Sequence, residues 1–175
     1  MKVLIVVDMQ NDFIDGSIGT KEAVGIVDRV AEVMDSFDGA VICTRDTHFA
    51  DYLETSEGRK LLVEHCIEGT KGHALQDTIQ KMAEKKQAVV MNKITFGAKN
   101  LPEEIEKLAG GVPEFIELVG LCTDICVISN AMLLKAFYPE VPISVDASAC
   151  AGVTPQSHKN ALEAMKMCQI DIVNE

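Results

Sequence analysis

The sequence predicts an α/β protein: a three-layer, open, parallel sheet of six strands with helices on both faces. Two observations support this fold. Short apolar runs rich in Val and Ile alternate along the chain with longer segments whose apolar residues recur at helical spacing. Several runs are almost continuously apolar, which is typical of strands buried on both faces of a parallel sheet. Because parallel neighbours need crossover connections, the alternation places helices between successive strands.

Each strand is expected where an apolar run is bounded by polar residues or glycine. The expected strands cover Lys2–Val7, Ala40–Thr44, Ala88–Asn92, Phe115–Val119, Ile143–Val145 and Ile170–Val173. The expected helices cover Lys21–Phe37, Ala74–Lys85, Leu101–Leu108, Cys126–Phe137 and Thr154–Met167. Met9–Gly19 and Arg45–Gly72 are expected to be loops, with one helical turn near Glu57–Val63.

Length and charge restrict the class of protein. The 175 residues predict one domain over residues 1–175. Sixteen Lys and Arg against 27 Asp and Glu give a net charge of −11, which argues against nucleic acid and anionic membranes as partners. The apolar start is short and is interrupted by Asp8, so it reads as a strand and not as a secretory signal. We therefore expect a cytoplasmic protein. Its six scattered cysteines predict no disulfide framework.

Polar side chains stand directly after several expected strands. Asp8 follows the first strand, the segment 45–48 (RDTH) the second, Lys93 the third, and Cys122 and Cys126 the fourth. The carboxyl ends of parallel strands meet at one edge of the sheet, where ligands bind in open α/β folds. An aspartate, a lysine and a cysteine brought together there would supply a proton acceptor, a cationic stabiliser and a nucleophile.

Cys126 is the candidate nucleophile because it begins the helix after the fourth strand. A helix N-terminus lowers the pKa of a thiol from its ordinary value of about 8.5. Each residue of this set also has a purely structural alternative. Cys126 could be a buried apolar cysteine, Asp8 a capping aspartate and Lys93 a surface lysine at a strand end. Their joint position at one sheet edge favours the catalytic interpretation.

Five segments resemble, in this order and spacing, the isochorismatase-like cysteine hydrolases, and most of all their nicotinamidase branch: VVDMQNDFIDGSI, TRDTH, HCIEGT, NKITFGA and VGLCTDICV. The resemblance extends from the first strand through Cys150. It implies the strand order 3-2-1-4-5-6 and a catalytic triad of Asp8, Lys93 and Cys126. It also implies a cis peptide before Cys122 and an oxyanion hole formed by the backbone N–H groups of Cys122 and Cys126.

The activity implied by the resemblance is hydrolysis of a small carboxamide through a thioester, with release of ammonia. Nicotinamide is the best single substrate. Isochorismatases proper lack the nucleophilic cysteine, so Cys126 favours an amide hydrolase. Phe13 aligns with the aromatic wall against the substrate ring, or else it is a hydrophobic staple under its loop. Several nicotinamidases place a tryptophan near the position of Leu62, whereas this chain has no tryptophan.

The resemblance further implies a divalent metal, with zinc first and manganese or iron as alternatives. Asp46 and His48 match the Asp-x-His metal motif, and His65 matches the histidine of the HC…GT segment. Carboxylate and imidazole ligands suit these ions. The third histidine of many nicotinamidases is absent, and we expect Glu54 in its place, although it could be a solvated loop acid. The other two histidines are expected at the surface.

Two other functions stay open. One is a related, metal-free hydrolase of ureido, carbamoyl or other small amides. The other is a non-catalytic family member that acts as a binding module. A tightly bound divalent metal would favour a nicotinamidase over the first alternative. Faster alkylation of Cys126 than of Cys168 would favour an enzyme over the second. On the resemblance alone, we expect a homo-oligomer.

Overall fold

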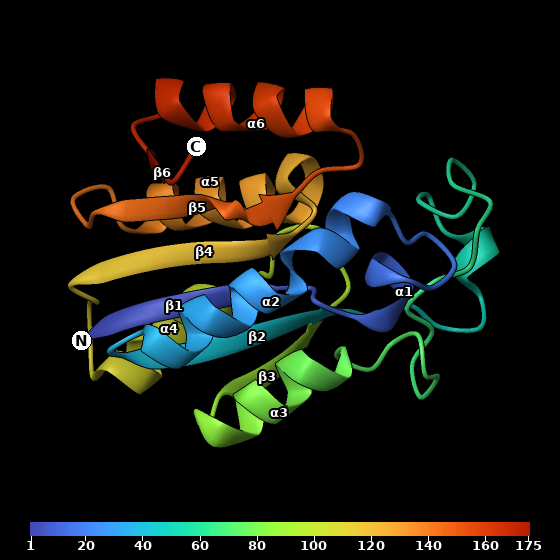
Figure 1. Ribbon diagram of the computed structural model, residues 1–175, viewed down its shortest axis with the longest axis horizontal. Helices are drawn as coiled ribbons and strands as arrows, with labels where there is room; N and C mark the ends of the chain where they lie inside the picture. The colour runs from blue at the N-terminus through green and yellow to red at the C-terminus, as the bar shows by residue number, and fades with distance from the viewer.

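A single parallel sheet of six strands organises the protein (Figure 1). The computed structural model describes residues 1–175. The strand order is β3-β2-β1-β4-β5-β6, and every neighbouring pair is parallel. The strands are β1 (Lys2–Val7), β2 (Ala40–Asp46), β3 (Val89–Lys93), β4 (Phe115–Leu121), β5 (Ile143–Ala151) and β6 (Asp171–Val173). The predicted fold class and strand order are therefore confirmed.

Helices cover both faces of the sheet, and each face has its own apolar core (Figure 1). One face carries α2 (Lys21–Ser36) and α3 (Asp77–Lys85), and the other carries α4 (Leu101–Ala109), α5 (Ile128–Phe137) and α6 (Pro155–Met167). Successive residues of β1 point to opposite faces, which is why this strand is apolar throughout. No helix has both the length and the apolar character needed to cross a membrane.

Local sequence signals fix several helix ends. The Thr20 side chain accepts a hydrogen bond from the Ala23 N–H at the start of α2. Thr154 and Ser157 form a reciprocal capping box at the start of α6. Gly110 ends α4 in the left-handed conformation, with φ of 72°. These caps explain why the helix boundaries could be predicted closely.

Four local predictions need correction. A one-turn helix, α1 (Asn11–Ile14), lies in the segment predicted to be a loop. A short 3-10 helix, η1 (Tyr52–Glu54), precedes the position predicted for a helical turn. Strand β5 continues to Ala151, because Ala and Ser residues carry little strand signal. A π-helical turn, η2 (Thr123–Val127), separates β4 from α5, so the regular helix begins later than predicted.

Gly120 allows β4 to approach β1 closely just before the polar edge of the sheet. Its φ is 113°, a conformation that residues with a side chain rarely adopt. A Cβ built on Gly120 would lie 2.2 Å from the carbonyl oxygen of Val7. Only glycine therefore fits here, and the close approach places the end of β4 beside Asp8, the next residue after β1.

Candidate active site

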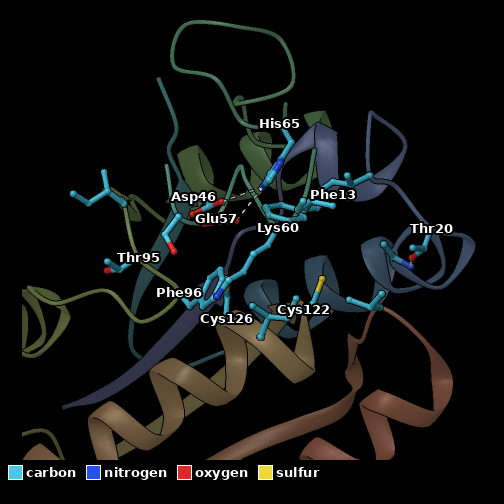
Figure 2. A pocket seen from close by; sticks show the side chains of 17 residues that line it. Phe13, Thr20, Asp46, Glu57, Lys60, His65, Thr95, Phe96, Cys122 and Cys126 are labelled. Atoms are coloured by element: carbon cyan, nitrogen blue, oxygen red, sulfur yellow. Dashed lines mark hydrogen bonds and ion pairs between the residues drawn. The ribbon is translucent and has the colours of Figure 1, made fainter. Parts of the chain in front are cut away.

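A cavity of about 650 Å³ opens at the carboxyl edge of the central strands (Figure 2). Its lining combines apolar side chains with a few polar groups, including Asp46, Glu57, His65 and Cys126. The other two members of the predicted triad, Asp8 and Lys93, are almost fully buried next to this cavity. The strand ends thus bring together the side chains that the sequence places after β1, β2, β3 and β4.

The ammonium group of Lys93 is the centre of the predicted triad. Its Nζ lies 2.7 Å from Asp8 Oδ2 and donates a hydrogen bond of 3.3 Å to Cys126 Sγ. It also lies 3.2 Å from Asp46 Oδ1. The triad residues are therefore in contact through one cation, and this cation also reaches the carboxylate of Asp46.

The two carboxylate oxygens of Asp8 have different partners, a hydroxyl on one side and the Lys93 ammonium on the other. Its Oδ1 accepts a 2.6 Å hydrogen bond from Thr44 Oγ1, and its N–H donates to the Thr44 carbonyl. Its Oδ2 is buried and, apart from the ion pair with Lys93, accepts no hydrogen bond. Asp8 has φ of 48°, which aspartate tolerates better than most residues. Because the ammonium group that pairs with Oδ2 also contacts Cys126 Sγ, this oxygen is the one suited to accept a proton from the thiol.

Burial shifts the acidity of this cluster. It raises the pKa of Asp8, which Lys93 opposes and Asp46 reinforces. Burial and the Asp8 charge raise the pKa of the Cys126 thiol well above its ordinary value, against the effect of Lys93. Burial alone would lower the pKa of Lys93, but the attraction of Asp8, Cys126 and Asp46 raises it instead. Burial thus disfavours the charged forms of Asp8 and Cys126, and the Lys93 ammonium group opposes this effect at both residues.

The candidate nucleophile, Cys126, lies in a turn and not at the start of a regular helix. Cys126 lies inside η2, and only 3% of its surface is exposed. This burial explains why its pKa rises, whereas the sequence suggested a lowering by a helix N-terminus. The Leu121–Cys122 peptide is cis, as the family resemblance implied. Asn130 fixes the turn by donating a 2.8 Å hydrogen bond to the Cys126 carbonyl.

Four side chains form a second cluster, directly beside the triad. The potential ligand atoms of Asp46, His48, Glu57 and His65 all lie within 4.8 Å of one another. His48 Nε2 lies 2.8 Å from Asp46 Oδ2, and Glu57 Oε1 lies 3.7 Å from the Nε2 atoms of both histidines. Asp46, His48 and His65 are the residues predicted from the sequence, and the structure brings them together.

Glu54, the predicted fourth ligand, is replaced in this cluster by Glu57. Glu54 ends η1 with an exposed side chain, whereas Glu57 lies in the following turn and faces both imidazoles. The error arises because spacing along a loop does not reveal which way its acids point. The 3-10 helix directs one glutamate to the solvent and the next toward His48 and His65.

The cluster fits a divalent cation. His48 Nε2 is buried and faces carboxylate oxygens of both acids, Asp46 Oδ2 at 2.8 Å and Glu57 Oε1 at 3.7 Å. His65 Nδ1 bonds the Val63 carbonyl at 2.9 Å, which directs its Nε2 toward Asp46 and Glu57. Two imidazoles and two carboxylates form a donor set that zinc, manganese and iron accept.

A buried glutamine, Gln10, holds the backbone of Asp46, one of the candidate metal ligands. Gln10 accepts a hydrogen bond from the Asp46 N–H at 2.7 Å and donates to the Asp46 carbonyl at 2.8 Å. It also donates to the carbonyl of His73, whose ring bonds Thr47. His73 is therefore buried, contrary to the prediction. This role of Gln10 was not predicted, although its position two residues after Asp8 places it at the same edge of the sheet.

The remaining predicted site residue, Phe13, lines the cavity from α1. Its ring packs edge-on against His65, with centroids 5.7 Å apart (Figure 2). The other predicted surface histidine, His158, is half-buried and shares a 2.7 Å hydrogen bond with Thr123 of η2. The region of Leu62, where a second aromatic wall would stand, instead exposes 76% of that leucine to solvent.

Fold and site together define the class of protein. The chain belongs to the isochorismatase domain family, whose model matches residues 2–174. It is 28% identical to the nicotinamidase/pyrazinamidase of Mycobacterium tuberculosis, over 99% of this chain and 98% of that protein.

Two solved structures extend this comparison. The pyrazinamidase of Pyrococcus horikoshii, in complex with zinc, matches with a TM-score of 0.79 and 26% identity, over 99% of both chains. The N-carbamoylsarcosine amidase of Thermoplasma acidophilum matches with a TM-score of 0.78 and 28% identity, over 98% of this chain and 94% of that one.

Proposed function

We propose that this protein is a cysteine-dependent amidohydrolase that converts a small carboxamide to a carboxylate and ammonia. The observation that carries the proposal is the position of Lys93 Nζ, which contacts both Asp8 Oδ2 and Cys126 Sγ at one side of the cavity. A nucleophile, a proton acceptor and a cation in direct contact meet the requirements of covalent amide hydrolysis.

On this proposal each residue has a role that its contacts support. Asp8 takes the thiol proton through Oδ2, the oxygen that pairs with Lys93, and the Cys126 sulfur attacks the amide carbonyl. The backbone N–H groups of Cys122 and Cys126 stabilise the oxyanion, a donor role worth about 10²–10³ in rate for each group. The C–N bond then breaks, and Asp8 returns the proton to the departing ammonia. Water cleaves the thioester by the same sequence of proton transfers, while Lys93 offsets the negative charge.

Nicotinamide is the substrate we propose first, with nicotinate as the product. The relatives from M. tuberculosis and P. horikoshii are named for nicotinamide or pyrazinamide hydrolysis. Phe13 offers an aromatic surface to a ring within the cavity. A second candidate is a carbamoyl or ureido compound, as in the name of the T. acidophilum relative. Leu62 favours it, because this exposed residue does not line the cavity and supplies no aromatic ring there, although Phe96 does line it.

We also propose that Asp46, His48, Glu57 and His65 hold a divalent cation, zinc first. A bound ion would supply a Lewis-acid position that orients the substrate. The potential ligand atoms of the two histidines and two carboxylates, which all lie within 4.8 Å of one another, support this proposal. On family resemblance we further propose a cytoplasmic homo-oligomer, which light scattering of the purified protein tests.

Ammonia release from a panel of nicotinamide, pyrazinamide and carbamoyl amino acids tests the reaction. Cys126→Ala should abolish turnover, whereas Cys168→Ala, which removes an exposed cysteine far along the chain, should leave it unchanged. Chelation followed by zinc return tests the metal. Turnover that survives in Cys126→Ala would refute the mechanism, and turnover that ignores the chelator would refute the metal proposal alone.

A further inference from the structure

Lys60 places a second cation in the cavity, apart from the triad. It lies in the turn that follows η1, and its side chain lines the cavity together with Phe96 and Cys126. Figure 2 shows its stem extending from beneath His65 toward Phe96 and Cys126. Lys93 lies buried outside the lining, so Lys60 is the only lysine or arginine among the residues that line the cavity.

The ammonium group of Lys60 has no partner in the protein. Its side chain forms no ion pair and no hydrogen bond; only its backbone N–H is engaged, with the Glu57 carbonyl. Glu57 is three residues earlier, a spacing at which ion pairs are common, but its carboxylate faces His48 and His65 instead. The protein has a net charge of −11, so acidic side chains are in excess, yet none of them pairs with the ammonium group of Lys60.

The surroundings of Lys60 favour a charged ligand. Ten of the 17 lining residues are hydrophobic, and the two lining carboxylates, Asp46 and Glu57, face His48 and His65. The Lys60 side chain is exposed to solvent, so its ammonium group can pair with an anion that enters the cavity. The volume of about 650 Å³ lies in the range of drug-sized ligands and exceeds what one small aromatic ring requires. The cavity therefore has room for an amide that carries a second functional group.

We propose that Lys60 is an anion-binding residue and that the enzyme prefers small amides bearing a carboxylate over neutral amides of equal size. This inference rests on the proposed amide hydrolysis and specifies its substrate class. The amide carbonyl lies at Cys126 while the carboxylate pairs with the Lys60 ammonium. A neutral amide such as nicotinamide reacts by the same steps but leaves Lys60 unpaired.

The test compares two amides that differ in one charge. Succinamate carries a carboxylate, and levulinamide has the same length with a methyl group in place of the carboxylate oxygen. A charge-assisted hydrogen bond predicts a kcat/KM about 10- to 100-fold higher for succinamate. Lys60→Met should remove this preference by raising the KM for succinamate far more than the KM for levulinamide. Lys60→Arg should retain the preference, and so should Lys71→Met, which removes an exposed lysine that is absent from the cavity lining.

The outcomes separate the two proposals. If Lys60→Met keeps the preference, or slows both amides equally, the anion-binding role is wrong while amide hydrolysis stands. If the wild type releases ammonia from no amide, the proposed function is wrong. Calorimetry then decides the role of Lys60 without turnover, using Cys126→Ala and succinamate. An affinity at least 10-fold weaker after Lys60→Met supports the anion site, and unchanged or undetectable binding overturns it.

Discussion

Replacing Gly120 with alanine tests whether the close approach of β4 to β1 is needed for stability and for the position of the residues that follow β4. The new Cβ would lie 2.2 Å from the Val7 carbonyl oxygen and 2.8 Å from the Val7 nitrogen. Holding alanine at φ of 113° costs about 1–3 kcal/mol, and the overlap adds about 1–3 kcal/mol. The total of about 2–6 kcal/mol is a large part of the roughly 5–15 kcal/mol that stabilises a typical domain. It predicts a loss of about 5–20 °C in Tm.

Gly110→Ala provides the matched control for this substitution. Gly110 also has positive φ, 72°, but no atom lies within 4 Å of its would-be Cβ. It should therefore show only the backbone cost, about 1–2 kcal/mol. Thermal and urea unfolding of both variants measures the difference, and ammonia release from folded Gly120→Ala reports displacement of the adjacent turn that holds Cys126. Equal losses of stability in the two variants would contradict the packing argument.

Three further predictions concern single carboxylates and their partners. Glu57→Gln should weaken zinc binding at least 10- to 100-fold in competition with a chelating dye, whereas Glu54→Gln should not change it. Thr44→Val removes a hydrogen bond that lowers the pKa of Asp8, so the acid limb of kcat/KM should move to higher pH. Burial raises the pKa of Glu117, so its ionisation costs stability as pH rises through that pKa. Glu117→Gln should raise Tm by about 2 °C near pH 8 and have no effect below about pH 4; an equal effect at both pH values would contradict this reasoning.

The sheet and the predicted triad could both be predicted from the sequence, because the apolar runs show where each strand lies and where it ends. Apolar runs mark buried strands, and the residue after each run lies at the carboxyl edge whatever the details of packing. Asp8, Lys93 and Cys126 could be placed together by this argument, and the distances between them agree with it. The π-helical form of the turn around Cys126 could not be read in the same way, because η2 and a regular helix share the same apolar pattern.

The loop between β2 and α3 was harder to predict from the sequence. Its polar residues have no period, so the sequence does not tell which acids face inward. Glu54 and Glu57 are three residues apart, and only the path of η1 separates the exposed one from the one near the histidines. Lys60 escaped notice for the same reason, since a lysine in a polar loop is ordinarily a surface residue.

Asp46 belongs to both clusters at once, because its two oxygens face different partners. Oδ1 lies 3.2 Å from the Lys93 ammonium, and Oδ2 lies 2.8 Å from the His48 ring. A cation bound beside His48 would compete with Lys93 for the charge of this one carboxylate. The two effects are thermodynamically linked: if a bound metal ion shifts the protonation of the triad, a change in that protonation shifts metal affinity by the same factor. The two halves of the site therefore cannot be tuned independently while Asp46 joins them.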